Sequence, residues 1–250
     1  MRLHVLHCGG DLSPMSISDP FDEDPGRLIY SPALAFLIEH PAGTVLFDSG
    51  YHERWQQGST VAGIGVEVGP EDHVVAQLSA IGVAASEVDL VVLSHLHCDH
   101  AGGLRHFPHA PVLVQAGERA FAARRPAYQE GFYDDRDTGH GPSWRELDGE
   151  LDLFGDGSIV ILPTPGHTPG HQSALVTLPS GAFVLAGDVS YQLAAMRQRH
   201  LSGVVWAADA TVASWELIEG LERSRGAQIM LAHDLGFRET MRLAPEASYP

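Results

Sequence analysis

Short apolar runs separated by turn-forming residues recur along most of the chain. Runs of about four to eight apolar residues bounded by glycine, proline or polar residues are typical of buried strands. This pattern predicts strands over Leu3–Cys8, Ala33–Glu39, Thr44–Asp48, Val88–Leu93, Pro111–Gln115, Ser158–Leu162, Gln172–Leu178, Ala182–Ala186 and Gln228–Leu231.

A helical period appears in fewer segments. Asp209–Arg223 carries one apolar stripe, made of Val212, Trp215, Leu217, Ile218 and Leu221. Glu71–Ile81 has the same kind of spacing, and Pro70 lies just before it, where a helix start tolerates proline. A third helix is expected over Gly117–Arg125. We interpret the glycine-rich segment Tyr51–Gly69 as a loop, and Pro126–Gly149 shows no clear period.

The order of these elements predicts the fold class. Strands and helices alternate, with hairpins between some strands, which is typical of a layered α/β protein with mixed sheets. We find no repeat, linker or low-complexity segment, so residues 1–250 are expected to form a single domain. The apolar runs are too short to span a bilayer, and the N-terminus lacks the apolar stretch of a secretory signal. A cytoplasmic protein without stable membrane association is expected.

Composition excludes several functions. The chain has 15 basic and 32 acidic residues, a formal net charge of −17, and every basic residue is arginine. Without lysine there is no Schiff-base chemistry and no phosphate-binding P-loop lysine. The negative charge argues against nucleic acid as a partner and against an anionic membrane surface. The two cysteines cannot form a disulfide framework, whereas 15 histidines are a reason to look for metal ligands.

One segment concentrates metal-binding side chains. His95, His97, Asp99 and His100 fall within six residues, directly after the buried strand Val88–Leu93. Imidazole and carboxylate are natural ligands of zinc and similar divalent ions. A spacing of two places His95 and His97 on one side of an extended chain, and the next two residues turn elsewhere. This arrangement suits a second ion beside the first; a solvated polar turn is the alternative.

Three further candidates follow other predicted strands. His167 comes after Ser158–Leu162, Asp188 after Ala182–Ala186, and His233 after Gln228–Leu231. If these strand ends meet at one edge of the sheets, five histidines and two aspartates converge. Such a set is large enough to hold two metal ions.

The pattern His95-x-His97-x-Asp99-His100, with the later His167, Asp188 and His233, resembles the metallo-β-lactamase superfamily over nearly the whole chain. The resemblance implies an αββα sandwich of two mixed sheets flanked by helices. It also implies one metal on His95, His97 and His167 and another on Asp99, His100 and His233. Asp188 and a hydroxide would bridge them. Zinc is the expected metal, and iron, manganese and cobalt accept the same ligands.

Within that superfamily, Thr164–Ser173 and Gly187–Tyr191 resemble the N-acyl-homoserine lactonases. The resemblance implies hydrolysis of the lactone ring of N-acyl-homoserine lactones, small-molecule signals whose loss quenches quorum sensing. The bridging hydroxide would attack the carbonyl, Tyr191 would stabilise the resulting oxyanion, and Asp99 would shuttle the proton. Tyr191 could instead be a core residue bonded to a backbone carbonyl. Another lactonase or esterase of the same fold, or a metal-binding module without hydrolytic activity, is the rival function, and a homodimer is left open.

Several supporting roles remain open at this point. Asp48 either orients a ligand histidine or caps its own turn. His171 is expected near the metals but not as a ligand. The resemblance implies that Cys98 lines the substrate pocket, and a role as a metal ligand is the less favoured alternative. The pocket wall comes from the loop with Tyr51, Trp55 and Ile64 or from the stretch with Phe132, Tyr133 and Trp144, and these residues could equally cover the core.

Overall fold

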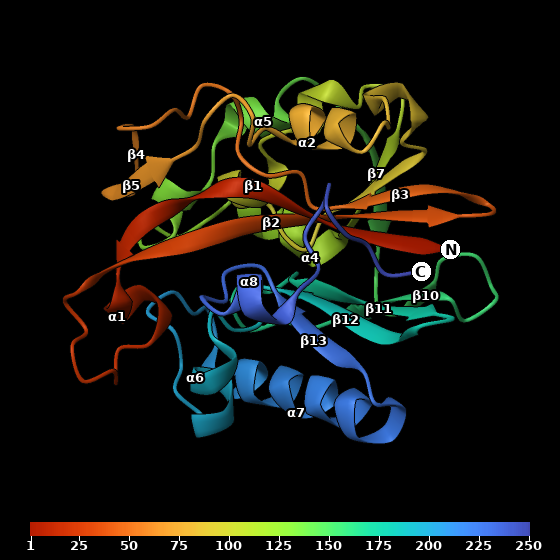
Figure 1. Cartoon of the computed structure of the whole chain (residues 1–250). Helices are drawn as coiled ribbons and strands as arrows, with labels where there is room; N and C mark the ends of the chain where they lie inside the picture. Colours follow the sequence, from red (N-terminus) through yellow and green to blue (C-terminus); the bar gives the residue numbers. More distant parts are fainter.

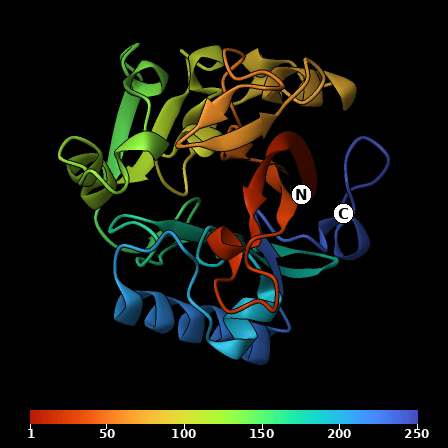
Figure 2. The ribbon, with the colours of Figure 1, turned by 90° about the vertical axis from the view of Figure 1, so that its left-hand side faces the viewer.

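Two mixed β-sheets pack face to face, and helices cover the outer face of each sheet (Figure 1). This architecture is seen in a computed structural model that describes all 250 residues. Figure 2 shows the four layers from the side, with the long helix α7 (Ala208–Arg225) beneath the second sheet. The predicted αββα sandwich is therefore confirmed.

The first sheet has eight strands in the order β4-β5-β1-β2-β3-β6-β7-β8. Their bounds are β1 (Arg2–Pro14), β2 (Leu28–His40), β3 (Gly43–Phe47), β4 (Thr60–Val61), β5 (Ile64–Glu67), β6 (Leu90–Val92), β7 (Pro111–Gln115) and β8 (Ser143–Leu147). β1, β2 and β3 pair antiparallel, whereas β3, β6, β7 and β8 run parallel.

The second sheet has five strands in the order β13-β12-β11-β10-β9. Their bounds are β9 (Leu151–Asp152), β10 (Ile159–Pro163), β11 (Gln172–Leu178), β12 (Gly181–Gly187) and β13 (Gln228–Leu231). β12 and β13 pair in parallel, so both end at the same edge of the sheet.

Helices α2 (Val74–Ala80) and α4 (Ala116–Ala122) pack on the first sheet, and α6 (Leu193–Gln198) and α7 pack on the second. The remaining helices are short: α1 (Met15–Ser18), α3 (Cys98–Ala101), α5 (Asp135–Thr138) and α8 (Phe237–Thr240), with 3₁₀ turns η1 (Ala85–Glu87), η2 (Leu104–His106) and η3 (Glu130–Phe132). None of these helices is both long enough and apolar enough to cross a membrane.

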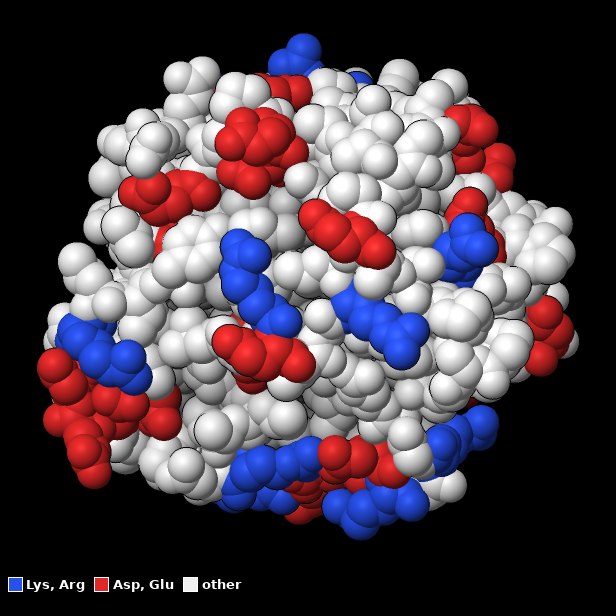
Figure 3. Space-filling view, viewed as in Figure 1, with Lys and Arg blue, Asp and Glu red and all other residues white.

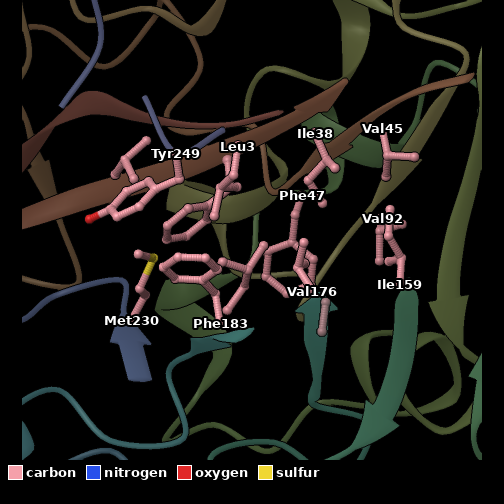
Figure 4. Close-up of a cluster of buried hydrophobic side chains, with 14 of the residues drawn as sticks. Leu3, Ile38, Val45, Phe47, Val92, Ile159, Val176, Phe183, Met230 and Tyr249 are labelled. Carbon is pink, nitrogen blue, oxygen red and sulfur yellow. The ribbon is translucent and has the colours of Figure 1, made fainter. Parts of the chain in front are cut away.

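The main core lies between the two sheets. Figure 4 shows Phe47 of the first sheet above Val176 and Phe183 of the second, with Met230 beside them. The sequence of β2 is continuously apolar because both faces of this strand are buried. Phe36 and Ile38 face the core between the sheets, while neighbouring side chains face the helices of the outer layer. Strands buried on both faces lose the alternating pattern of a half-exposed sheet.

Some element boundaries differ from the prediction. The first strand continues past Cys8 to Pro14, because a one-residue register shift between His7 and Gly10 absorbs the two glycines. The segment Tyr51–Gly69, interpreted as a loop, contains the hairpin β4–β5, which extends the edge of the first sheet. The stretch 126–149 contains α5 and β8. These elements are too short to show a period in the sequence.

Charged side chains are spread over the surface in Figure 3, and acidic groups are found on every part of the face shown. Near α6 and α7, arginines lie directly against acids. Arg197 and Arg199 both contact Glu219, at 2.9 and 2.6 Å. These pairs neutralise part of the charge locally and leave the rest of the surface acidic.

Candidate metal centre

All seven predicted ligands converge at one edge of the sandwich. The ligand atoms of His95, His97 and His167 lie within 4.8 Å of one another. The same limit holds for a second group made of Asp99, His100 and His233. A third group, His95, His100 and Asp188, connects the two. The strand ends therefore meet at one edge of the sandwich, as the sequence pattern predicts.

Asp188 lies between the two histidine groups. Its Oδ1 is 3.1 Å from Nε2 of His100, and its Oδ2 is 3.1 Å from Nε2 of His233 and 3.5 Å from Nε2 of His167. The residue follows β12 through Gly187, whose φ of +51° turns the chain at this point. One carboxylate can therefore reach ions on both sides.

The buried polar atoms of this cluster fit a bound cation. Nε2 of His95, His97 and His100 and Oδ1 of Asp188 are buried and form no hydrogen bond, although the last two atoms lie 3.1 Å apart. Buried polar atoms are nearly always satisfied, so a group of four without partners calls for an explanation. Their nitrogen and oxygen lone pairs are the donors that zinc and related divalent ions take.

Asp48 orients one of these imidazoles. His100 donates from Nδ1 to Oδ2 of Asp48 at 2.8 Å, and the amide and hydroxyl of Ser94 donate to the same carboxylate. The bond leaves Nε2 of His100 free to face Asp188. Asp48 therefore orients a candidate ligand, which decides between the two interpretations of its sequence position.

Backbone carbonyls orient two more of the candidate ligand histidines. His167 donates from Nδ1 to the carbonyl of Val204 at 2.9 Å, and His233 donates to that of Pro32 at 2.6 Å. These bonds fix which nitrogen carries the proton and direct Nε2 inward. His171 is a neighbour of the cluster, as predicted: its Nε2 accepts from the amide of Asp188 at 3.0 Å.

Electrostatics divides the histidines into two sets. Burial lowers the pKa of His95, His97 and His167, so these imidazoles are neutral at physiological pH and keep a lone pair for a metal. Burial also opposes protonation of His100 and His233, but nearby carboxylates, Asp188 above all, outweigh it and raise their pKa.

Glu118 is a functional support that the sequence did not reveal. This buried carboxylate on α4 accepts from the amide of Leu96 at 3.0 Å and from the hydroxyls of Thr168 at 2.6 Å and Tyr133 at 3.0 Å. It thereby connects the loops that carry His97 and His167. A glutamate in the first turn of a helix is usually exposed, so the pattern gave no signal.

A cavity opens directly beside the cluster and encloses about 460 Å³, part of it open to solvent. Its apolar wall comes from both candidate loops: Tyr51, Val61 and Ile64 from one and Phe132 from the other. Trp55, Tyr133 and Trp144 do not line it. The expectation that Cys98 lines the pocket is wrong, because this residue packs behind the wall in one buried cluster with Tyr51 and Val61. Cys98 is also not among the convergent ligands.

Tyr191 stands at the boundary between cavity and cluster. Its ring packs edge-on against His167 and His233, with centroids 5.7 and 5.0 Å apart. Burial raises the pKa of its phenol well above the usual value, so the hydroxyl keeps its proton. No protein group accepts that proton, in contrast to the alternative of a core tyrosine bonded to a backbone carbonyl.

The sequence model of the metallo-beta-lactamase superfamily matches residues 30–222. The N-acyl homoserine lactonase AttM of Azorhizobium caulinodans is 33% identical over 257 residues, covering 98% of this chain and 97% of the relative. An N-acyl homoserine lactonase of Bacillus thuringiensis is 28% identical over 233 residues, covering 89% of each chain.

Solved structures share the fold. An N-acyl homoserine lactone hydrolase with the product N-hexanoyl-L-homoserine at its catalytic metal centre superposes with a TM-score of 0.86 at 24% identity, covering 98% of this chain and 97% of that one. The dizinc quorum-quenching lactonase AidC gives a TM-score of 0.73 at 16% identity, covering 93% and 87%. The two-sheet architecture is therefore common to all three chains.

Proposed function

The chain belongs to the metallo-beta-lactamase superfamily, and from that premise we propose that it is a dinuclear metal-dependent hydrolase that opens the lactone ring of N-acyl homoserine lactones. One observation carries the proposal. Seven convergent ligand residues lie beside a cavity that Tyr191, whose phenol has no hydrogen-bond partner in the protein, also lines. Full-length similarity to N-acyl homoserine lactonases supports the choice of substrate.

The metal assignment follows the geometry of the cluster. His95, His97 and His167 would hold one cation and Asp99, His100 and His233 a second, and Asp188 lies between the two groups. Zinc suits this nitrogen and oxygen set, which iron, manganese and cobalt also accept. Cations held there would supply Lewis acidity, the chemistry that makes water nucleophilic at neutral pH and polarises a carbonyl.

Two side chains act on the reacting atoms. As water adds to the carbonyl carbon, negative charge develops on the carbonyl oxygen, and Tyr191 donates its hydroxyl proton to that oxygen as a hydrogen bond. Asp99 has the more exposed carboxylate, at 15% of its side chain, compared with 2% for Asp188. It takes the proton released by the attacking water and can return it to the ring oxygen as the carbon–oxygen bond breaks.

The cavity suits a neutral substrate with an apolar tail. Val61, Ile64 and Phe132 offer an apolar wall for an acyl chain, while the metal-side wall is polar. The net charge of −17 disfavours anionic substrates. Ring opening destroys the signal and so quenches quorum sensing. We also propose a cytoplasmic location, because the free cysteines Cys8 and Cys98 fit a reducing compartment.

The rival is a hydrolase of the same fold that acts on a different small lactone or ester. A substrate panel separates the two. Zinc-loaded protein would be given N-acyl homoserine lactones of short and long chain, a simple γ-lactone, phenyl acetate, a β-lactam and a glutathione thioester, and kcat/KM compared. We expect the highest kcat/KM for an N-acyl homoserine lactone, with a product heavier by one water. A higher kcat/KM for a non-lactone would contradict the proposal.

A further inference from the structure

A polar wall of the cavity lies outside the metal cluster and has no role in the mechanism above. Asp11 of β1 lies on this wall, together with Ser13 and Ser31. It pairs with Ser31 of β2 and with Val66 of β5 in the sheet. Asp11 is buried, with only 8% of its surface exposed.

A β-bulge places Asp11 on this wall. Before the bulge His7 pairs with Leu34, and after it Gly10 pairs with Pro32, so β1 gains one residue relative to β2. A shift of one residue exchanges the two faces of a strand. Gly9 has a φ of +78°, and a Cβ on Gly10 would lie 2.2 Å from the carbonyl oxygen of Ser31, so glycines are needed at the bulge. The bulge at Gly9-Gly10 therefore determines that Asp11 lies on the face of β1 that lines the cavity.

The carboxylate of Asp11 is poorly satisfied. Its Oδ1 is buried without a hydrogen-bond partner, and its Oδ2 accepts only a long bond of 3.4 Å from the hydroxyl of Tyr51. The other two carboxylates that line the cavity, Asp99 and Asp188, both contact His233. Leaving a buried acceptor unpaired is unfavourable, so a donor that enters the cavity would be bound strongly.

We propose that Asp11 accepts a hydrogen bond from the substrate and selects lactones that carry an N–H group on the carbon next to the ring carbonyl. The inference rests on the proposed function and adds a specificity-determining residue to it. In an N-acyl homoserine lactone the amide nitrogen is one carbon away from the reacting carbonyl. Asp11, Asp99 and Tyr191 line the same cavity, so a carbonyl held beside Tyr191 and Asp99 leaves this N–H group inside the cavity that Asp11 also lines.

The test compares two lactones of nearly equal shape. N-hexanoyl homoserine lactone carries the N–H donor, and α-hexanoyloxy-γ-butyrolactone has an ester oxygen in its place. Ring opening of each would be measured with zinc-loaded wild type, Asp11→Ala and Asp11→Asn. Asp209→Asn, which removes an exposed carboxylate from the first turn of α7, is the matched control. Zinc content and thermal unfolding of each variant would be recorded.

A hydrogen bond to a charged group predicts that wild type prefers the amide by about tenfold or more in kcat/KM. Asp11→Ala should lose most of this preference, mainly through a higher KM for the amide, while the ester changes little and zinc content holds. Asp11→Asn keeps the shape of the side chain, and its preference for the amide should fall between those of wild type and Asp11→Ala. Asp209→Asn should show the same preference as wild type.

Equal loss on both lactones would assign Asp11 a structural role and overturn the inference, as would an unchanged preference in Asp11→Ala. Either result leaves the lactonase function standing. Wild type that opens neither lactone when loaded with zinc would instead overturn the proposed function, and the inference would fall with it.

Discussion

At the scale of single residues, three of the candidate ligands, His100, His167 and His233, are held by atoms that are distant along the chain. The imidazole of His233 donates to Pro32, 201 residues away, and that of His167 donates to Val204. The ligands themselves could be predicted, because histidine and aspartate directly after apolar strands are unusual. Their partners could not, because any backbone carbonyl can accept and sequence does not show which one is near.

Tyr191 gives the clearest residue-scale prediction. Because its hydroxyl has no partner in the protein and the residue lines the cavity, Tyr191→Phe should lower kcat for N-hexanoyl homoserine lactone by about a hundredfold or more, the loss expected for one oxyanion donor. Zinc content, measured by elemental analysis, should stay at the wild-type value.

Loss of zinc from Tyr191→Phe would contradict this role and show that the ring packing against His167 and His233 supports the ligands. An unchanged kcat would mean that the hydroxyl does not contact the carbonyl oxygen.

At the scale of elements, strands buried on both faces could be predicted from the sequence, and short edge elements could not. β6 and β7 read as plain apolar runs. The hairpin β4–β5 is held by pairing with β1 and not by a pattern of its own. The extension of β1 also escaped the sequence pattern, because two glycines and polar residues interrupt it, and with it the cavity wall around Asp11 was missed.

Helix α4 supports the metal centre through Glu118. Because this carboxylate accepts from Leu96, Thr168 and Tyr133, Glu118→Ala leaves three buried donors without a partner. We expect the free energy of unfolding of the metal-free protein to fall by about 3 kcal/mol. Urea denaturation measures this change.

Glu216→Ala, on the exposed face of α7, is the matched control and should change the unfolding free energy by less than about 0.5 kcal/mol. Glu118→Gln keeps one acceptor oxygen and should lose less stability than Glu118→Ala. Equal stability of Glu118→Ala and wild type would show that these three hydrogen bonds do not hold the loops.

At the scale of the whole molecule, the sandwich collects chemistry from distant parts of the sequence at one edge. The ligand residues span positions 95 to 233 and meet because the strands that carry them end at the same edge. The absence of lysine excludes Schiff-base and P-loop lysine chemistry, and the charge of −17 disfavours anionic substrates. In the function that we propose, cations held by the centre of histidine and aspartate would supply the positive charge for attack on a neutral lactone.

The most direct test of this account is a metal titration of lactonase activity. Protein stripped with a chelator would receive increasing zinc, and bound zinc and ring opening of N-hexanoyl homoserine lactone would be measured together. We predict no turnover without metal, a rise that levels off at two zinc ions per chain, and no turnover by Asp188→Ala at any zinc concentration. Full activity of the stripped protein, a plateau at one zinc ion, or wild-type activity of Asp188→Ala would contradict the dinuclear lactonase.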